Sequence, residues 1–120
     1  MHELGVIQNI FQILEDVAAE NRLITITKVR LKVGQLQQIV PDMLSFAFET
    51  VAKGTKAEGA SLETEIVPIR MQCRTCHTEF VVAEHTYICP QCSGTSLDTL
   101  QGTEIVLESI EGEQAENIDY

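Results

Sequence analysis

The feature that most constrains this sequence is a pair of Cys-x-x-Cys motifs, Cys73 to Cys76 and Cys89 to Cys92, with 12 residues between them. This spacing is typical of a zinc ribbon, in which two short turns present four sulfurs to one point. Four thiolates complete a tetrahedral zinc shell and leave no position for a substrate. The motifs therefore predict a structural zinc ion, which supplies the folding free energy of a module with little apolar core.

Two other interpretations of the cysteines explain less of the sequence. Cys73 to His77 also spells the attachment signature of c-type haem, but haem attachment would require export and would leave Cys89 and Cys92 unexplained. A redox dithiol is the second alternative, although the spacing of two pairs favours zinc. We interpret His77 and His85 as exposed loop residues, because four thiolates need no further ligand.

Length and charge limit the classes of partner. A chain of 120 residues has room for one core and a small satellite module. We find neither an apolar run of membrane-spanning length nor a signal peptide, so we expect a cytoplasmic protein with no membrane partner and with reduced thiols. We also expect a monomer. A net charge of -10, from 8 basic and 18 acidic residues, disfavours nucleic acid as a partner.

Apolar periodicity outside the cysteine region predicts two helices and three strands. The first helix covers residues 4–20, with its apolar stripe at Ile7, Ile10, Phe11, Leu14, Val17 and Ala18. The second begins at Pro41, carries Leu44, Ala47, Phe48 and Val51 on its apolar stripe and stops at Gly54. The predicted strands are residues 23–33, 62–69 and 103–110. A phase slip near Thr27 indicates a bulge or burial on both faces of the first strand.

These elements predict an α+β fold of the small α/β type. Two helices pack on a roughly three-stranded sheet, and a zinc ribbon is inserted between two of its strands. The predicted domains are an α/β domain of residues 1–70 with 101–112, a zinc-ribbon domain of residues 71–100 and an acidic tail of residues 113–120, with disorder expected from Glu111 onward. We interpret the bases that gather at Arg22, Lys28, Arg30 and Lys32 as a solvated strand face, with a docking patch as the alternative.

The sequence opens Met1-His2-Glu3. On composition alone, His2 is interpreted as an exposed surface residue. We nevertheless expect Met1 to be retained, and its amine, the His2 backbone nitrogen and the His2 imidazole then form adjacent chelate rings. Glu3 can add a backbone nitrogen or a carboxylate. Such nitrogen-rich, planar coordination suits Ni(II) or Cu(II) better than zinc.

Three features together resemble the HypA/HybF family of hydrogenase maturation factors. They are the opening Met1-His2-Glu3, the stretch from Val33 to Glu49 and the paired cysteine motifs. The resemblance implies that the α/β domain binds nickel through Met1, His2 and Glu3, and that Cys73, Cys76, Cys89 and Cys92 bind zinc. It further implies nickel delivery to the large-subunit precursor of [NiFe]-hydrogenase, in cooperation with a HypB-type GTPase.

The resemblance favours a nickel metallochaperone, which binds Ni(II) at an exposed site and releases it by ligand exchange. The alternative is a zinc-ribbon adapter that binds only proteins and has no use for His2. We do not expect an enzyme, because the sequence shows no nucleophile paired with a base and no phosphate-binding loop.

Overall fold

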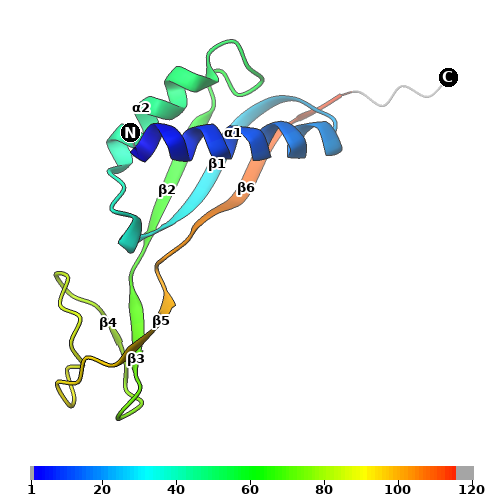
Figure 1. Ribbon diagram of the computed structural model, residues 1–120. Coiled ribbons are helices and arrows are strands. Elements are labelled where there is room, and N and C mark those ends of the chain that lie inside the picture. Colours follow the sequence, from blue (N-terminus) through cyan, green and yellow to red (C-terminus); the bar gives the residue numbers. More distant parts are fainter. Residues whose placement is uncertain (1, 116–120) are drawn as a thin grey trace. The chain divides into compact units, whose positions relative to one another are not determined.

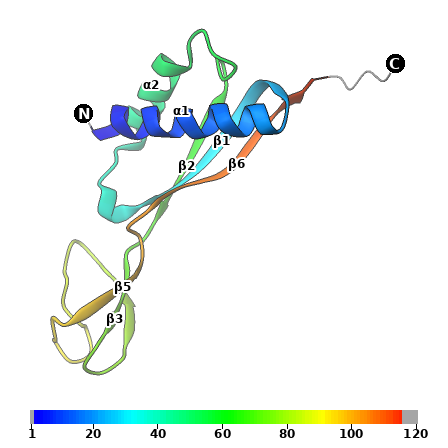
Figure 2. The same cartoon turned by 45° about the vertical axis from the view of Figure 1, so that its right-hand side comes forward.

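The computed structural model describes residues 2–115, with the backbone alone for His2. Contacts divide the chain into two compact units (Figures 1 and 2), residues 1–31, 39–64 and 107–120 in the first and residues 32–38 and 65–106 in the second. The predicted boundaries of the zinc-ribbon domain, at residues 71 and 100, differ from those of the compact units and stay a prediction. In chain order the elements are α1 (His2–Glu20), β1 (Leu23–Gly34), the 3-10 turn η1 (Gln35–Gln37), α2 (Pro41–Ala52), β2 (Ser61–Val67), β3 (Arg70–Cys73), β4 (Glu79–Val81), β5 (Leu97–Gln101) and β6 (Ile105–Gln114).

The core of the first unit lies between α1 and α2. The rings of Phe11 and Phe48 approach to 5.3 Å between centroids, tilted by 40°. Around them the helices bury aliphatic side chains at helical spacing, namely Ile7, Ile10, Leu14 and Ala18 from α1 and Leu44, Ala47 and Ala52 from α2. The predicted apolar stripes are therefore confirmed, except that Val17 and Val51 are only partly buried.

The sheet has the strand order β2-β1-β6, and the cysteine region is inserted between two of its strands, as the sequence predicts. The second half of β1 is its most buried part, because Val29, Leu31 and Val33 are fully covered. Ile26 is also buried, so the buried side of β1 changes from even to odd positions after Thr27, as the phase slip predicted. The cysteine region leaves the chain between β2 and β6, which both pair with β1.

Strand β6 is longer than the sequence predicts. The expectation of disorder from Glu111 is wrong as far as Gln114, because this segment continues the strand. Backbone pairing explains the difference, since Ala115 N–H donates to Arg22 O at 2.8 Å at the end of the strand. The polar composition of this segment gave no sign of a strand, because an edge strand needs few apolar side chains. The rest of the predicted tail, residues 116–120, lies outside the described residues.

The basic residues of β1 are held by acids on neighbouring strands. The Lys28 ammonium lies 3.1 Å from one Glu63 carboxylate oxygen, and the Arg30 guanidinium lies 2.9 Å from the other. Lys28 also reaches Glu111 of β6 at 3.8 Å. The hydrogen bond from Lys28 is the main cause that lowers the pKa of Glu63, with Arg30 acting in the same sense. This pairing favours the solvated strand face over a free basic patch.

Two glycines allow a close backbone crossing in the second unit. Gly102 has φ +94°, and a Cβ there would lie 2.6 Å from Ile69 Cα and 2.7 Å from Pro68 O. Gly34 has no room for a Cβ either, because it faces the Gly102 carbonyl, while Leu36 N–H donates to Gly102 O at 3.0 Å. The crossing therefore requires glycine at both positions.

Replacing Gly102 with Ala should lower the free energy of unfolding by about 2 to 4 kcal/mol, because strain at positive φ adds to backbone overlap. Gly59→Ala is the matched control, since Gly59 has φ +79° but a Cβ added there would meet no atom of the described residues within 4 Å. Urea unfolding of both variants measures the difference. Equal losses would show that the crossing adds nothing to the cost of positive φ.

Candidate metal centre

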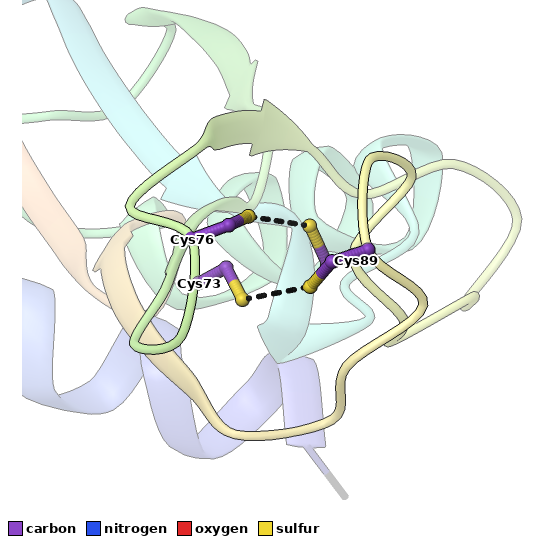
Figure 3. A group of neighbouring side chains, drawn as sticks. Cys73, Cys76 and Cys89 are labelled. Atoms are coloured by element: carbon purple, nitrogen blue, oxygen red, sulfur yellow. Dashed lines mark hydrogen bonds between the residues drawn. The ribbon is translucent and has the colours of Figure 1, made fainter.

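The first cysteine turn follows β3. Cys73 N–H donates to Thr78 O, and His77 N–H donates back to Cys73 O, both at 2.9 Å. His77 adopts a left-handed conformation with φ 64°, which closes the turn directly after Cys76. This backbone arrangement curls the Cys-x-x-Cys segment so that Cys73 and Cys76 share one side of the turn (Figure 3).

The second cysteine turn repeats the backbone pattern of the first. Cys89 N–H donates to Gly94 O, and Ser93 N–H donates to Cys89 O, again both at 2.9 Å. Ser93 has φ 61°, at the same place in its turn as His77 in the first. Gly94 packs tightly behind the sulfurs, because an added Cβ would lie 3.2 Å from Cys92 Sγ. Two matching turns thus face each other.

A three-stranded antiparallel sheet lies beside the two cysteine turns. The first turn follows its central strand, and the second turn is followed by one of its edge strands. Its order is β4-β3-β5, and Met71 of the central strand pairs with Phe80 on one side and Thr99 on the other. Cys73 is the last residue of β3 and pairs with Leu97, the first residue of β5. The sheet thereby fixes where the chain enters the first turn and where it leaves the second.

The four sulfurs form one cluster, as the sequence predicts. All four ligand atoms lie within 4.8 Å of one another, and both Cys73–Cys92 and Cys76–Cys89 have Sγ–Sγ distances of 3.5 Å. Figure 3 shows Cys89 facing Cys73 and Cys76. A disulfide bond measures about 2.05 Å, so these are free thiols. Tetrahedral zinc with Zn–S bonds of about 2.3 Å separates its sulfurs by about 3.8 Å, which the cluster fits.

The electrostatics of the cluster also suit a divalent cation. The Thr78 hydroxyl, 3.2 Å from Cys76 Sγ, stabilises the thiolate and is the main cause that lowers the pKa of Cys76 to about 6. Gly94 N–H acts in the same direction on Cys92, but the neighbouring Cys73 and Cys76 sulfurs outweigh it and raise the pKa of Cys92 to about 12. Four thiolates this close repel one another until a cation joins them. Zinc supplies that charge.

Burial divides the cluster into an inner and an outer half. Cys73 and Cys89 are buried, Cys76 is partly exposed and Cys92 is exposed. The cluster contains no histidine among residues 2–115, and His77 and His85 both lie at positive φ in loops. The donor set is therefore purely thiolate, which is the structural type of zinc site.

In the second group of predicted ligands, Glu3 and the backbone of His2 lie at the start of α1. The helix begins at His2, whose side chain lies outside the described part of the chain, as does all of Met1. Glu3 is 7% exposed, and its carboxylate accepts a hydrogen bond of 3.3 Å from Val40 N–H. Sequence reasoning missed this contact, since no local signal links Glu3 to the loop before α2.

Comparison with known proteins identifies the family. The family model described as "Hydrogenase/urease nickel incorporation, metallochaperone, hypA" matches residues 1–112. The chain belongs to the HypA family. Curated HypA relatives include hydrogenase maturation factors from Desulfitobacterium hafniense, 39% identical over 95% of this chain and 100% of the relative, and from Aquifex aeolicus, 34% identical over 92% and 96%.

Solved structures agree on the fold. The solution structure of the Ni metallochaperone HypA from Helicobacter pylori aligns with a TM-score of 0.70, covers 96% of this chain and 100% of that one, and shares 24% of its residues. HypA membership makes this chain one of a family of nickel metallochaperones for hydrogenase maturation, with nickel as cargo and zinc as structural ion. Within residues 2–115, no helix combines the length and apolarity needed to cross a membrane.

Proposed function

We propose that this chain binds Ni(II) through Met1, His2 and Glu3 and carries it to the large-subunit precursor of [NiFe]-hydrogenase. A HypB-type GTPase takes part in the transfer, which we place in the cytoplasm. Cys73, Cys76, Cys89 and Cys92 hold zinc in a structural role. The proposal assigns no catalytic residue, because a closed four-thiolate shell leaves no open coordination position.

The observation that supports this ligand assignment is the start of α1 at His2. The first amide N–H groups of a helix make no hydrogen bond to a carbonyl one turn earlier, so binding a metal through backbone nitrogens at this end does not require the helix to unwind. Such nitrogens can bind Ni(II) after losing their protons, together with an amine and an imidazole. The cluster of Cys73 is separate and already complete with four thiolates.

The same location favours release of the metal. The start of a helix carries a partial positive charge from the helix dipole, which disfavours a bound cation by some tenths of a kcal/mol to about 1 kcal/mol. Glu3 is committed in part to Val40 N–H, so its carboxylate is not free to close round the ion. A site of this kind binds by chelation yet stays open to an incoming ligand.

A transfer experiment tests the proposal. The zinc-loaded chain is given one equivalent of Ni(II) and mixed with the cognate large-subunit precursor, the partner GTPase and GTP. The chain and the precursor are then separated, and metal in each fraction is measured by mass spectrometry. We expect nickel in the precursor and zinc still in the chain. If the two proteins bind each other but nickel stays where it was loaded, the chain is a zinc-ribbon adapter and the proposal is wrong.

A further inference from the structure

An apolar groove lies beside the start of α1. It has a volume of about 340 Å³ and is lined by Leu4 of α1 and by Asp42, Met43, Phe46, Ala47 and Thr50 of α2. Phe46 is 71% exposed and Met43 is 46% exposed. This volume is at the small end of ligand pockets, which suits one or two side chains of a partner better than a whole cofactor.

The exposure of Phe46 has no structural explanation within its helix. The apolar stripe of α2 runs through Leu44, Ala47 and Phe48, which are buried, and Phe46 falls off that stripe. Single exposed apolar residues are normal on protein surfaces. Phe46 differs because Met43 and Leu4 extend it into one continuous apolar surface, and such surfaces mark sites of protein contact.

The charges around the groove limit which kind of protein surface can bind there. The two helices carry six acidic side chains and no Lys or Arg, with four acids in α1 and two in α2. Asp42 lines the groove, and Glu49 lies three positions after Phe46, which is one helical turn. A second copy of this chain would bring two acidic layers together, which like-charge repulsion opposes. A partner with an apolar side chain ringed by Lys or Arg is complementary.

The position of the groove indicates which partner this is. Leu4 follows His2 by two residues on the first turn of α1, and Figures 1 and 2 show this end of α1 beside α2. Transfer by ligand exchange requires a ligand of the acceptor to reach the nickel ion before the first ligands leave. The surface of the acceptor must therefore contact the start of α1, and the groove is the apolar surface available there.

We infer that the groove between Leu4 and Phe46 docks the protein that accepts nickel, through an apolar side chain of the acceptor surrounded by basic residues. This inference rests on the proposed nickel transfer. Apolar contact at Phe46 supplies affinity, and the acidic helices favour a basic surface and speed the encounter. Docking then holds the acceptor ligands near the ion, so transfer becomes an intramolecular step.

The test compares Phe46→Ser with Ile13→Ser. Ile13 is an exposed apolar residue of α1, 46% accessible and outside the groove. Phe and Ser have similar helix propensities, so neither change should unfold its helix. Each nickel-loaded protein is mixed with the large-subunit precursor at subsaturating concentration, in the presence of the partner GTPase and GTP. In a separate assay it is mixed with the small chelator EDTA, which needs no docking surface.

We expect Phe46→Ser to slow transfer to the precursor by about 30-fold, the effect of losing one interface hot spot, and to leave loss to EDTA within twofold of wild type. Ile13→Ser should match wild type with both acceptors. Unchanged transfer to the precursor in Phe46→Ser would overturn the inference while leaving the nickel proposal intact. If nickel moved from the wild-type protein to EDTA but never to the precursor, both the docking inference and the proposed nickel transfer would be overturned.

The inference also requires that the groove is not covered by a second copy of this chain. Light scattering of the free chain reports whether Phe46 is covered by a second copy. We expect wild type and Phe46→Ser to have the same mass. A wild-type dimer that Phe46→Ser converts to a monomer would show that the groove is an interface between copies of this chain, and docking of a nickel acceptor there would be ruled out.

Discussion

Replacing Cys73 with Ser is expected to release zinc and unfold residues 71–100. Cys73 is fully buried and joins β3 to the cluster, so the change removes both a ligand and the end of the central strand. Structural zinc contributes about 10 to 16 kcal/mol of binding free energy in small zinc modules, far more than so small a core supplies on its own. Zinc content by mass spectrometry and amide hydrogen exchange across residues 71–100 measure the effect.

The control for this prediction is His77→Asn. The change removes the imidazole next to Cys76 but keeps a residue that tolerates the left-handed φ of 64° at this position. We expect full zinc content and unchanged exchange protection in this variant. A Cys73→Ser protein that retained zinc and slow exchange would refute a structural role for the four-cysteine site.

Replacing His2 with Ala is expected to lower Ni(II) affinity by at least about 100-fold while leaving zinc in place. The imidazole closes one of the chelate rings, and loss of a ligand costs several kcal/mol, where 1.4 kcal/mol is tenfold in affinity. The zinc cluster consists only of cysteines, so its content should not change. Titration calorimetry with Ni(II) and thermal unfolding of the zinc-loaded protein provide the two readouts.

His85→Asn is the matched control for nickel. His85 lies in a loop of the second unit at φ 60°, and Asn accepts that conformation. If His85 supplied the imidazole, this variant would lose nickel binding and His2→Ala would keep it. That result would move the nickel site away from the start of the chain.

Local patterns predicted most of the fold. Apolar spacing gave the faces of α1 and α2, and Pro41 marked the start of the second helix where the structure has it. Those signals depend on neighbours three or four residues apart, so the sequence displays them directly. The end of β6 was missed because Glu111 to Gln114 are polar, and their strand conformation depends on pairing with β1, which is remote in the sequence.

The metal cluster could be predicted from the sequence and the groove could not, again because only the cluster depends on local spacing. Each cysteine turn is local, and its spacing alone predicts that its sulfurs face one point. The burial of Glu3 against Val40 and the close approach of Gly102 to Ile69 join segments far apart in the sequence. Phe46 gave a weak signal, because it lies off the apolar stripe of its helix, but only the structure joins it to Leu4.

One measurement tests the central claim most directly, namely that nickel binds at the N-terminal amine and His2. A chain whose Met1 amine carries an acetyl group keeps every side chain and removes the amine as a ligand. Titration calorimetry of this zinc-loaded protein should show Ni(II) affinity reduced by at least about tenfold, since a chelate ring is lost. Nickel affinity equal to that of the unmodified chain would contradict the claim that the Met1 amine is a ligand.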